Sequence, residues 1–402
     1  MHIGFDARLL AYREGGIARY ARSLLRALTS ANRENEYTIL VARNGAPVID
    51  DSGNGDRINH RALLTPPHHR LERTTLGLEL APLHFDVFHS PDFIPPRLRR
   101  GTRAVITVHD LAFLRDQALL DEQSRRYYGQ IHEAVRRADA IIAPSQSTRR
   151  DLLALTDAIT EKIFVVPEAA DQRYRPLKRA ERMAALRNPQ RTKLSPDLVR
   201  LVSGEFGPFL LFVGTIEPRK NLSMLFRAYE RYREQAGRRA ATLVLAGAAG
   251  WRADAEMATI ERLRRNNKLV WFDSPSDEQL LLLYNAASLL LLPSHYEGFG
   301  LTAIEAMACG TPVLASDRSS LPEVLGATGL LLPPDDEEAW IAAIREVNEH
   351  RDRREALIVA GLRRSAEFSW ARAARETLAV YRRVLGQQEP LESAEMVASC
   401  QD

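Results

Sequence analysis

Residues 289–310 read LLLLPSHYEGFGLTAIEAMACG, an apolar run followed by a glycine-bearing loop and a helix-like segment. The run 289–292 predicts a buried strand, and residues 302–309 have the composition of a helix. Gly298 and Gly300 allow tight backbone conformations in the loop that joins them. Because a helix start presents unpaired N–H groups and the positive end of its dipole, the stretch predicts an anion-binding strand–loop–helix unit.

Two carboxylates, Glu297 and Glu305, flank this unit. Their oxygens suit hydroxyl groups, so loop and carboxylates together indicate a ligand that carries both phosphate and polyol, as a nucleotide sugar does. A purely structural interpretation is also open, because Thr302 and Glu305 match a capping box and Gly310 is a common helix stop. The motif alone does not decide between the two.

The same alternation of strand and helix extends through the rest of the chain, in one series before residue 173 and another after residue 205. Such alternation predicts parallel sheets with crossover helices. The predicted fold class is α/β, with two Rossmann-like doubly wound domains facing across a cleft. The predicted strands are 3–5, 37–41, 87–89, 104–108, 140–143, 209–213, 242–246, 269–272, 289–292 and 313–315.

Domain boundaries follow from composition. Residues 173–205 are polar and rich in Arg and Pro, with little strand signal, which indicates a linker or connecting helix. The helical run near the C-terminus packs either at the domain junction or at the periphery, and the segment after it is expected to be disordered. The predicted divisions are a first domain at 1–178, a linker at 179–205, a second domain at 206–368, a helix at 369–387 and a tail at 388–402.

Composition restricts the class of protein. With 402 residues and 45% hydrophobic content, the chain is expected to be globular. The longest apolar stretch, 280–292, is shorter than the ~20 residues of a membrane span, and the first residues lack the pattern of a secretory signal. With only two cysteines, Cys309 and Cys400, we expect no disulfide framework and a cytoplasmic location.

Charge is distributed unevenly along the chain, whose net charge is +3. Residues 1–200 hold 32 Lys and Arg against 24 Asp and Glu, whereas residues 201–402 hold 23 against 28. Solvated helix faces would explain the Arg pairs of the first half. The alternative is a basic patch that makes peripheral contact with an anionic membrane or a lipid-linked acceptor. No nucleic-acid-binding motif is present, so nucleic acid is not expected as a partner.

Polar residues follow two further predicted strands. Arg219 and Lys220 lie on the turn after the strand 209–213, and ligands of open α/β sheets bind at the carboxyl ends of strands. An arginine fork beside a lysine point charge can hold a diphosphate. In the first domain, His109 and Asp110 end a strand, where the imidazole could contact a sugar hydroxyl.

A loop at 14–20 follows the first predicted strand and opens a helix. Its Gly15 and Gly16 can let the backbone approach a phosphate closely. The dinucleotide fingerprint Gly-x-Gly-x-x-Gly is absent from this loop, which counts against a nicotinamide cofactor. His68 and His69 lack further ligands at metal spacing, so no metal is expected.

Together these motifs resemble the retaining nucleotide-sugar glycosyltransferases of family four, which have the GT-B architecture of two Rossmann-like domains. The resemblance covers nearly the whole chain. It is most specific over 293–334, where PSHYEGFGL, EAMACGTPV, LPEV and GLLLPP occur in order and seven residues separate Glu297 from Glu305.

By this resemblance the second domain binds the donor. Glu305 would bind the donor ribose, and Arg219 with Lys220 would hold the diphosphate. Glu297 would meet the donor sugar and phosphates. The loop backbone would meet the same groups through Phe299, Gly300 and Leu301.

The first domain would then lie on the acceptor side. His109 would contact the transferred sugar near the reaction centre, and Gly15 and Gly16 would approach the donor phosphate. Many relatives carry Arg directly after the strand-end glycine, where this chain has Thr215. Arg219 would take over the role of that arginine.

The implied reaction transfers a hexose from a nucleoside diphosphate sugar to a hydroxyl of a glycan or lipid-linked acceptor, with retention, in surface polysaccharide or glycolipid assembly. Positioning and leaving-group neutralisation would carry catalysis without metal or other cofactor. Residues 6–8 and the loop at 15–20 are similar to the corresponding segments of mannosyltransferases of surface polysaccharide assembly. This similarity makes GDP-mannose the leading donor. The alternatives are a UDP-sugar donor, a nucleotide-sugar epimerase and a non-catalytic nucleotide-binding scaffold. The residues expected to carry catalysis are His109, Arg219, Lys220 and Glu297.

Overall fold

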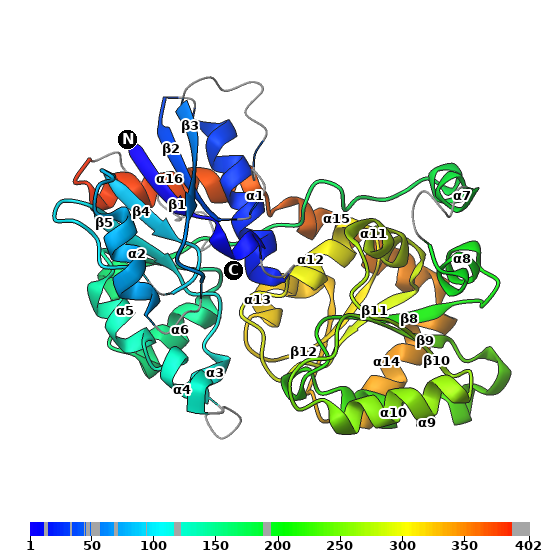
Figure 1. Ribbon diagram of the computed structural model, residues 1–402. Helices are drawn as coiled ribbons and strands as arrows, with labels where there is room; N and C mark the ends of the chain where they lie inside the picture. The colour runs from blue at the N-terminus through cyan, green and yellow to red at the C-terminus, as the bar shows by residue number, and fades with distance from the viewer. Residues whose placement is uncertain are drawn as a thin grey trace, which may run out of the picture. The chain divides into compact units, whose positions relative to one another are not determined.

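The chain forms two compact units in the computed structural model (Figure 1). The first unit contains residues 1–168 and the chain from Trp370 onward, and the second contains Ala169–Ser369. The predicted tail 388–402, Glu14, His68 and His69 lie outside the described residues. The residues that the structure describes are 1–11, 15–32, 34–43, 45, 49, 57–67, 71–93, 95–115, 122–187 and 194–387.

The sheet of the first unit has, in the part of the chain described, seven parallel strands in the order β3-β2-β1-β4-β5-β6-β7. The strands are β1 (His2–Asp6), β2 (Glu36–Ala42), β3 (Ile58–Leu63), β4 (Val87–Ser90), β5 (Arg103–Thr107), β6 (Ala140–Ala143) and β7 (Ile163–Val165). The helices of this unit are η1 (Arg8–Ala11), α1 (Gly16–Ala31), α2 (Glu72–Leu80), α3 (Ala112–Arg115), α4 (Glu122–Tyr128), α5 (Ile131–Arg137), α6 (Gln146–Leu155), η4 (Thr160–Lys162) and α16 (Trp370–Val384).

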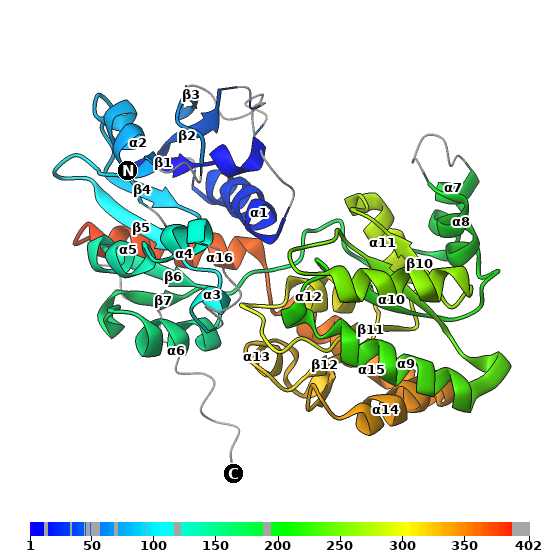
Figure 2. The same cartoon turned by 60° about the horizontal axis from the view of Figure 1, so that its bottom comes forward.

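Helix α16 packs beside α1 in the first unit (Figure 2). Its side chains at helical spacing, among them Ala374, Leu378 and Tyr381, are buried together with Leu24 and Leu28 of α1. The sequence predicts this helix at the domain junction or at the periphery. Its apolar stripe completes a core of the first unit, because burial of that stripe is favourable wherever a matching apolar face is available.

The second unit contains six parallel strands among its described residues, in the order β10-β9-β8-β11-β12-β13. The strands are β8 (Phe209–Val213), β9 (Thr242–Ala246), β10 (Leu269–Phe272), β11 (Leu289–Leu292), β12 (Val313–Ser316) and β13 (Leu330–Leu332). The helices are α7 (Arg179–Arg187), α8 (Pro196–Ser203), η5 (Pro218–Lys220), α9 (Leu222–Ala236), η6 (Gly237–Arg239), α10 (Asp254–Arg265), α11 (Asp277–Ala286), α12 (Leu301–Ala308), α13 (Leu321–Leu325), η7 (Gly326–Thr328), α14 (Glu337–Glu349) and α15 (Arg351–Ala366).

Alternate residues of β8 face opposite sides of this sheet, as the period of a strand requires. Leu211 and Val213 join a core with residues of α8, α11 and α12, whereas Leu210 and Phe212 join another with residues of α9, α10 and α14. Both faces are covered by helices, so the strand is apolar throughout and the sheet is doubly wound.

The segment 179–205, predicted as a linker, forms helices α7 and α8 in the second unit. Helix α8 is well delimited, because the Ser195 hydroxyl accepts a hydrogen bond from the Leu198 N–H at 3.3 Å and Gly204 ends it with a φ of 87°. Leu198 and Leu201 are buried in the core of the unit. The second unit therefore starts at Ala169 rather than at residue 206.

Strand order reverses once in each sheet, between β1 and β4 and between β8 and β11. The carboxyl ends of parallel strands at such a reversal diverge into loops and leave room for a ligand. The loops that follow β8 and β11 start side by side because these two strands are hydrogen-bonded neighbours. No helix in the described part of the chain is both long and apolar enough to cross a membrane.

Candidate functional site

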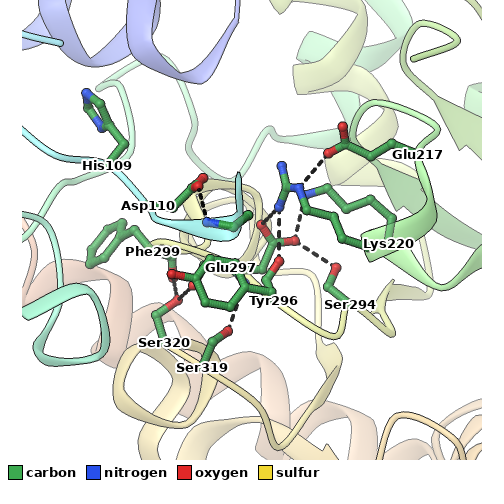
Figure 3. A network of polar contacts seen from close by, with 12 residues as sticks. His109, Asp110, Glu217, Lys220, Ser294, Tyr296, Glu297, Phe299, Ser319 and Ser320 are labelled. Carbon is green, nitrogen blue, oxygen red and sulfur yellow. Dashed lines mark hydrogen bonds and ion pairs between the residues drawn. The ribbon is translucent and has the colours of Figure 1, made fainter. Parts of the chain in front are cut away.

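The loops after β8 and β11 bring three of the predicted site residues into contact. Arg219 and Lys220 lie on η5, and Glu297 lies on the loop before α12. Lys220 Nζ is 2.6 Å from Glu297 Oε1, and Arg219 Nη1 is 3.1 Å from Glu297 Oε2. The Ser294 hydroxyl donates to the same Oε1 at 2.7 Å, so that Lys220 and Ser294 converge on Glu297 (Figure 3).

These charges are buried and compensate one another. Glu297 is 8% exposed and Lys220 is 9% exposed. Burial raises the pKa of the Glu297 carboxyl, but the Lys220 and Arg219 cations outweigh it and hold that pKa at about 2. Burial, reinforced by the Arg219 charge, lowers the pKa of Lys220 although Glu297 opposes the shift. The carboxylate is therefore ionised at neutral pH and tied to both cations.

Two serines hold the backbone of the loop that carries Glu297. The Glu297 N–H donates to Ser319 Oγ at 2.8 Å, and the Ser320 hydroxyl is 2.9 Å from the Glu297 carbonyl and 2.8 Å from that of Phe299 (Figure 3). Gly300 has a φ of 104°, which side chains rarely allow, and is the N-cap of α12. A glycine cap offers no side-chain oxygen to the first N–H groups of the helix.

Glu305 lies inside α12 and is 2% exposed. Its Oε2 accepts a hydrogen bond from the Tyr284 hydroxyl at 2.8 Å. The capping-box interpretation of Thr302 and Glu305 is wrong, because the helix begins at Leu301 with Gly300 as its N-cap. Glu305 is thus a buried carboxylate on the helix that follows the loop.

His109 lies at the carboxyl end of β5 in the first unit, and protein groups bond to both of its ring nitrogens. Nε2 is 2.9 Å from the Pro91 carbonyl oxygen, and Nδ1 is 3.1 Å from Glu168 Oε1. The Pro91 carbonyl can only accept, so Nε2 donates to it while Nδ1 faces the Glu168 carboxyl group. Burial lowers the pKa of His109, but the bond to Glu168 outweighs burial and the pKa is raised. The ring also packs edge to face against Tyr20, with centroids 4.6 Å apart.

The other predicted residues of the first unit are exposed glycines at the start of α1. Gly15 is the N-cap and Gly16 the first helical residue, and no described atom lies within 4 Å of where a Cβ would stand on either. Arg8 has a different place: it is 1% exposed and pairs with Asp6 at 2.7 Å and Glu72 at 2.6 Å. This arginine is a buried structural cation.

Polar contacts at the site also come from residues that the sequence does not single out, among them Ser294, Tyr284 and Glu217, besides Ser319 and Ser320. Glu217 Oε1 is 2.7 Å from Arg219 Nε. Glu217 stands two residues before Arg219 and Ser294 three before Glu297, so proximity to the motifs was the available signal. In the described residues, no group of three or more His, Cys, Asp and Glu side chains is arranged to hold a metal ion.

Comparison with known proteins identifies the family. The model described as "Glycosyltransferase Family 4" matches residues 14–173, and that described as "Glycosyl transferases group 1" matches residues 200–364. A D-inositol 3-phosphate glycosyltransferase from Nocardia farcinica is 30% identical over 91% of this chain and 84% of its own length. The chain belongs to glycosyltransferase family 4.

One more curated protein is similar to this glycosyltransferase in sequence, and two solved structures are similar to it in fold. O-antigen chain mannosyltransferase B from Escherichia coli is 29% identical over 95% of this chain and all of its own length. Sucrose-phosphate synthase from Thermosynechococcus elongatus superposes with a TM-score of 0.71, at 22% identity, over 96% of this chain and 100% of that one. WaaG, a glycosyltransferase involved in lipopolysaccharide biosynthesis, superposes with a TM-score of 0.68 at 15% identity. The superposition covers 95% of this chain and 99% of WaaG. The prediction of two Rossmann-like domains of the GT-B class is confirmed.

Proposed function

We propose that this glycosyltransferase is a retaining hexosyltransferase that moves mannose from GDP-mannose to a hydroxyl of a glycan or lipid-linked acceptor in surface polysaccharide or glycolipid assembly. The cation pair Arg219 and Lys220, held at the reversal of strand order beside the glycine-capped start of α12, carries the proposal. Cations and a helix start are the groups that bind phosphates. Similarity to O-antigen chain mannosyltransferase B over the full length supports mannose.

Two carboxylates balance the charges of the cation pair. Arg219 and Lys220 face Glu217 and Glu297 through ion pairs of 2.6 to 3.1 Å. A diphosphate adds negative charge, so it would draw Lys220 and Arg219 partly away from Glu297. The Glu297 oxygens would then be available to hydroxyls of the donor sugar, while Glu305 would bind the ribose. Glu297 would thus hold the cations before the donor binds and the sugar afterwards.

The proposed transfer takes place on one face of the sugar. The acceptor oxygen forms its bond to the anomeric carbon as the bond to the leaving phosphate oxygen breaks, and the leaving diphosphate takes the acceptor proton. Arg219 and Lys220 would neutralise the charge that develops on the leaving group, and positioning would supply much of the remainder. His109 would exchange the Pro91 carbonyl for a hydroxyl of the transferred sugar.

A second candidate concerns the acceptor. D-inositol 3-phosphate glycosyltransferases match this chain at 30% identity over nine-tenths of its length, among them the one from Nocardia farcinica. Transfer to an inositol phosphate is therefore the alternative to a glycan acceptor. A UDP-sugar would present a similar diphosphate and ribose to the same residues, so it stays the alternative donor.

Nucleotide-dependent thermal stabilisation tests the donor site first, because a ligand that binds the folded state raises the melting temperature. We expect GDP to raise it more than UDP, ADP or dTDP, and GDP-mannose to label a mannan or inositol phosphate acceptor. A UDP-selective shift moves the donor to a UDP-sugar, and a changed sugar in donor-only incubations indicates an epimerase. Folded protein that no nucleotide stabilises contradicts the donor site.

We also propose a cytoplasmic location, with peripheral contact between the basic half of the chain and anionic lipid. The excess of Lys and Arg over residues 1–200 supports it. Co-sedimentation with phosphatidylglycerol vesicles, absent with phosphatidylcholine vesicles and lost at high salt, is the expected result. Equal recovery with both lipids contradicts it.

A further inference from the structure

Glu217 is the second buried carboxylate beside the cation pair, at 8% exposed, and its two oxygens have different partners. Oε1 pairs with Arg219 Nε at 2.7 Å. Oε2 accepts a hydrogen bond from the indole N–H of Trp251 at 3.1 Å. The carboxylate therefore bridges a tryptophan to the arginine of the site.

The backbone places Trp251 at this position. It lies on the loop between β9 and α10, which is joined to the loop after β8 by hydrogen bonds from the Gly250 N–H to the Ile216 carbonyl and from the Ile216 N–H to the Ala248 carbonyl, both 2.9 Å. A Cβ on Gly250 would stand 2.6 Å from the Thr215 methyl group and 2.8 Å from the Ile216 oxygen. Glycine is required there for the two loops to approach.

Exposure indicates what Trp251 contributes. Its side chain is 41% exposed, whereas Trp340 is fully buried in the core of the same unit. A half-exposed indole recovers only part of the free energy that burial offers. The hydrogen bond to a buried carboxylate is therefore its most specific contact, since bonds to charged acceptors are stronger than neutral ones.

Arg219 is held along two edges of its guanidinium. Glu217 fixes the Nε edge, and Nη1 donates to Glu297 Oε2 at 3.1 Å and to the Tyr296 carbonyl at 3.0 Å. Because the guanidinium is rigid and planar, fixing two of its nitrogens fixes the plane. Loss of the Trp251 bond frees the Glu217 carboxylate to rotate and loosens one of these edges.

We infer that Trp251 is a positioning residue: through Glu217 it fixes the orientation of Arg219 for a diphosphate. The inference rests on the donor site proposed above. Trp251 lies outside the phosphate-binding motif and orients Arg219 before the ligand arrives, and such preorganisation increases affinity by reducing the ordering cost of binding.

The test compares Trp251→Phe, which removes the indole N–H and keeps an aromatic ring, with Trp271→Phe. Trp271, on β10, donates its indole N–H to the backbone carbonyl of Gly247 at 2.9 Å. Trp271→Phe is therefore a matched control, because it also removes one indole hydrogen bond. Binding of inorganic pyrophosphate and of GDP is measured by calorimetry, with melting temperatures as a folding control. We expect Trp251→Phe to weaken both ligands about tenfold, equivalent to about 1.4 kcal/mol, and Trp271→Phe to change neither by more than about twofold.

A double-mutant cycle between Trp251 and Glu217, read from pyrophosphate binding, separates a positioning role from a general structural effect. Glu217→Gln should weaken pyrophosphate to a similar degree, and Trp251→Phe should add little in the Glu217→Gln background, because both act through one contact. Additive losses, or unchanged pyrophosphate binding by folded Trp251→Phe, overturn the inference. A loss confined to GDP also overturns it, because it indicates a contact between the ring and the base. Wild-type protein that binds neither ligand contradicts the donor site itself, and the inference with it.

Discussion

Replacement of Lys220 by alanine should abolish most turnover while leaving a folded protein. Lys220 Nζ lies 2.6 Å from Glu297 Oε1 in a buried pair, so the substitution removes one of the two cations proposed for the leaving diphosphate. Loss of one preorganised electrostatic donor typically lowers kcat by about 10² to 10³, or roughly 2.7 to 4 kcal/mol. We expect a decrease of at least about a hundredfold in mannose transfer from saturating GDP-mannose.

The same substitution has a calculable effect on stability. Removal of one partner from a buried ion pair costs about 3 to 5 kcal/mol when the other charge is left unpaired. Here Arg219 and Ser294 still bond to Glu297, so we expect a smaller loss of about 1 to 3 kcal/mol in the free energy of unfolding, measured by urea denaturation.

Two further variants make the result interpretable. Lys220→Met combined with Glu297→Gln removes the unpaired carboxylate and should recover stability without recovering turnover. Lys178→Ala removes an exposed lysine of the same unit and should leave both quantities unchanged. A folded Lys220→Ala protein whose kcat stays within about threefold of wild type refutes the electrostatic role that we assign to Lys220.

Three other predictions concern single residues. The pKa of Glu297 is held at about 2, below the ordinary value of 4.5. The ionised carboxylate therefore contributes to stability above pH 4.5, and this contribution is lost as the pH falls towards 2. The fall in the free energy of unfolding over that pH window should be smaller in Glu297→Gln. Glu168→Gln should lower the pKa of His109, as read from the imidazole signals in NMR titrations, and an unchanged pKa contradicts the ion pair. Gly300→Ala, at a φ of 104°, should cost about 1 to 2 kcal/mol of stability in denaturant titrations and weaken GDP binding, and wild-type values for both would contradict the strain.

Strand prediction succeeded for the longer apolar runs, including β10 at a sheet edge, whose predicted and observed bounds are both 269–272. The central strands β8, β9 and β11 have the bounds expected from their apolar runs. The sequence misses β3, β7 and β13. All three lie at sheet edges. The polar residues Asn59, His60 and Arg61 interrupt the apolar pattern of β3. Strands β7 and β13 are apolar but only three residues long each, too short for a pattern of their own.

The candidate site was predictable as a set of residue types but not as a set of contacts. The spacing of glycines, paired cations and carboxylates at strand ends is enough to predict a site that binds phosphate and hydroxyl groups. Lys220 and Glu297 stand 77 residues apart, and their ion pair requires β8 to lie beside β11. Strands that are not consecutive in the chain become neighbours through packing of the whole sheet, which local patterns do not encode.

By itself the sequence determined the α/β class, the two-domain organisation, the family and the loops that carry the candidate site, because periodicity and glycine placement act locally. Only the tertiary structure decided that α16 completes the core of the first unit, that Arg8 is a buried structural cation and that Trp251 reaches Arg219 through Glu217. Each of these depends on which faces meet after folding. Burial and hydrogen bonding between distant segments settle that choice, since no short stretch contains both partners.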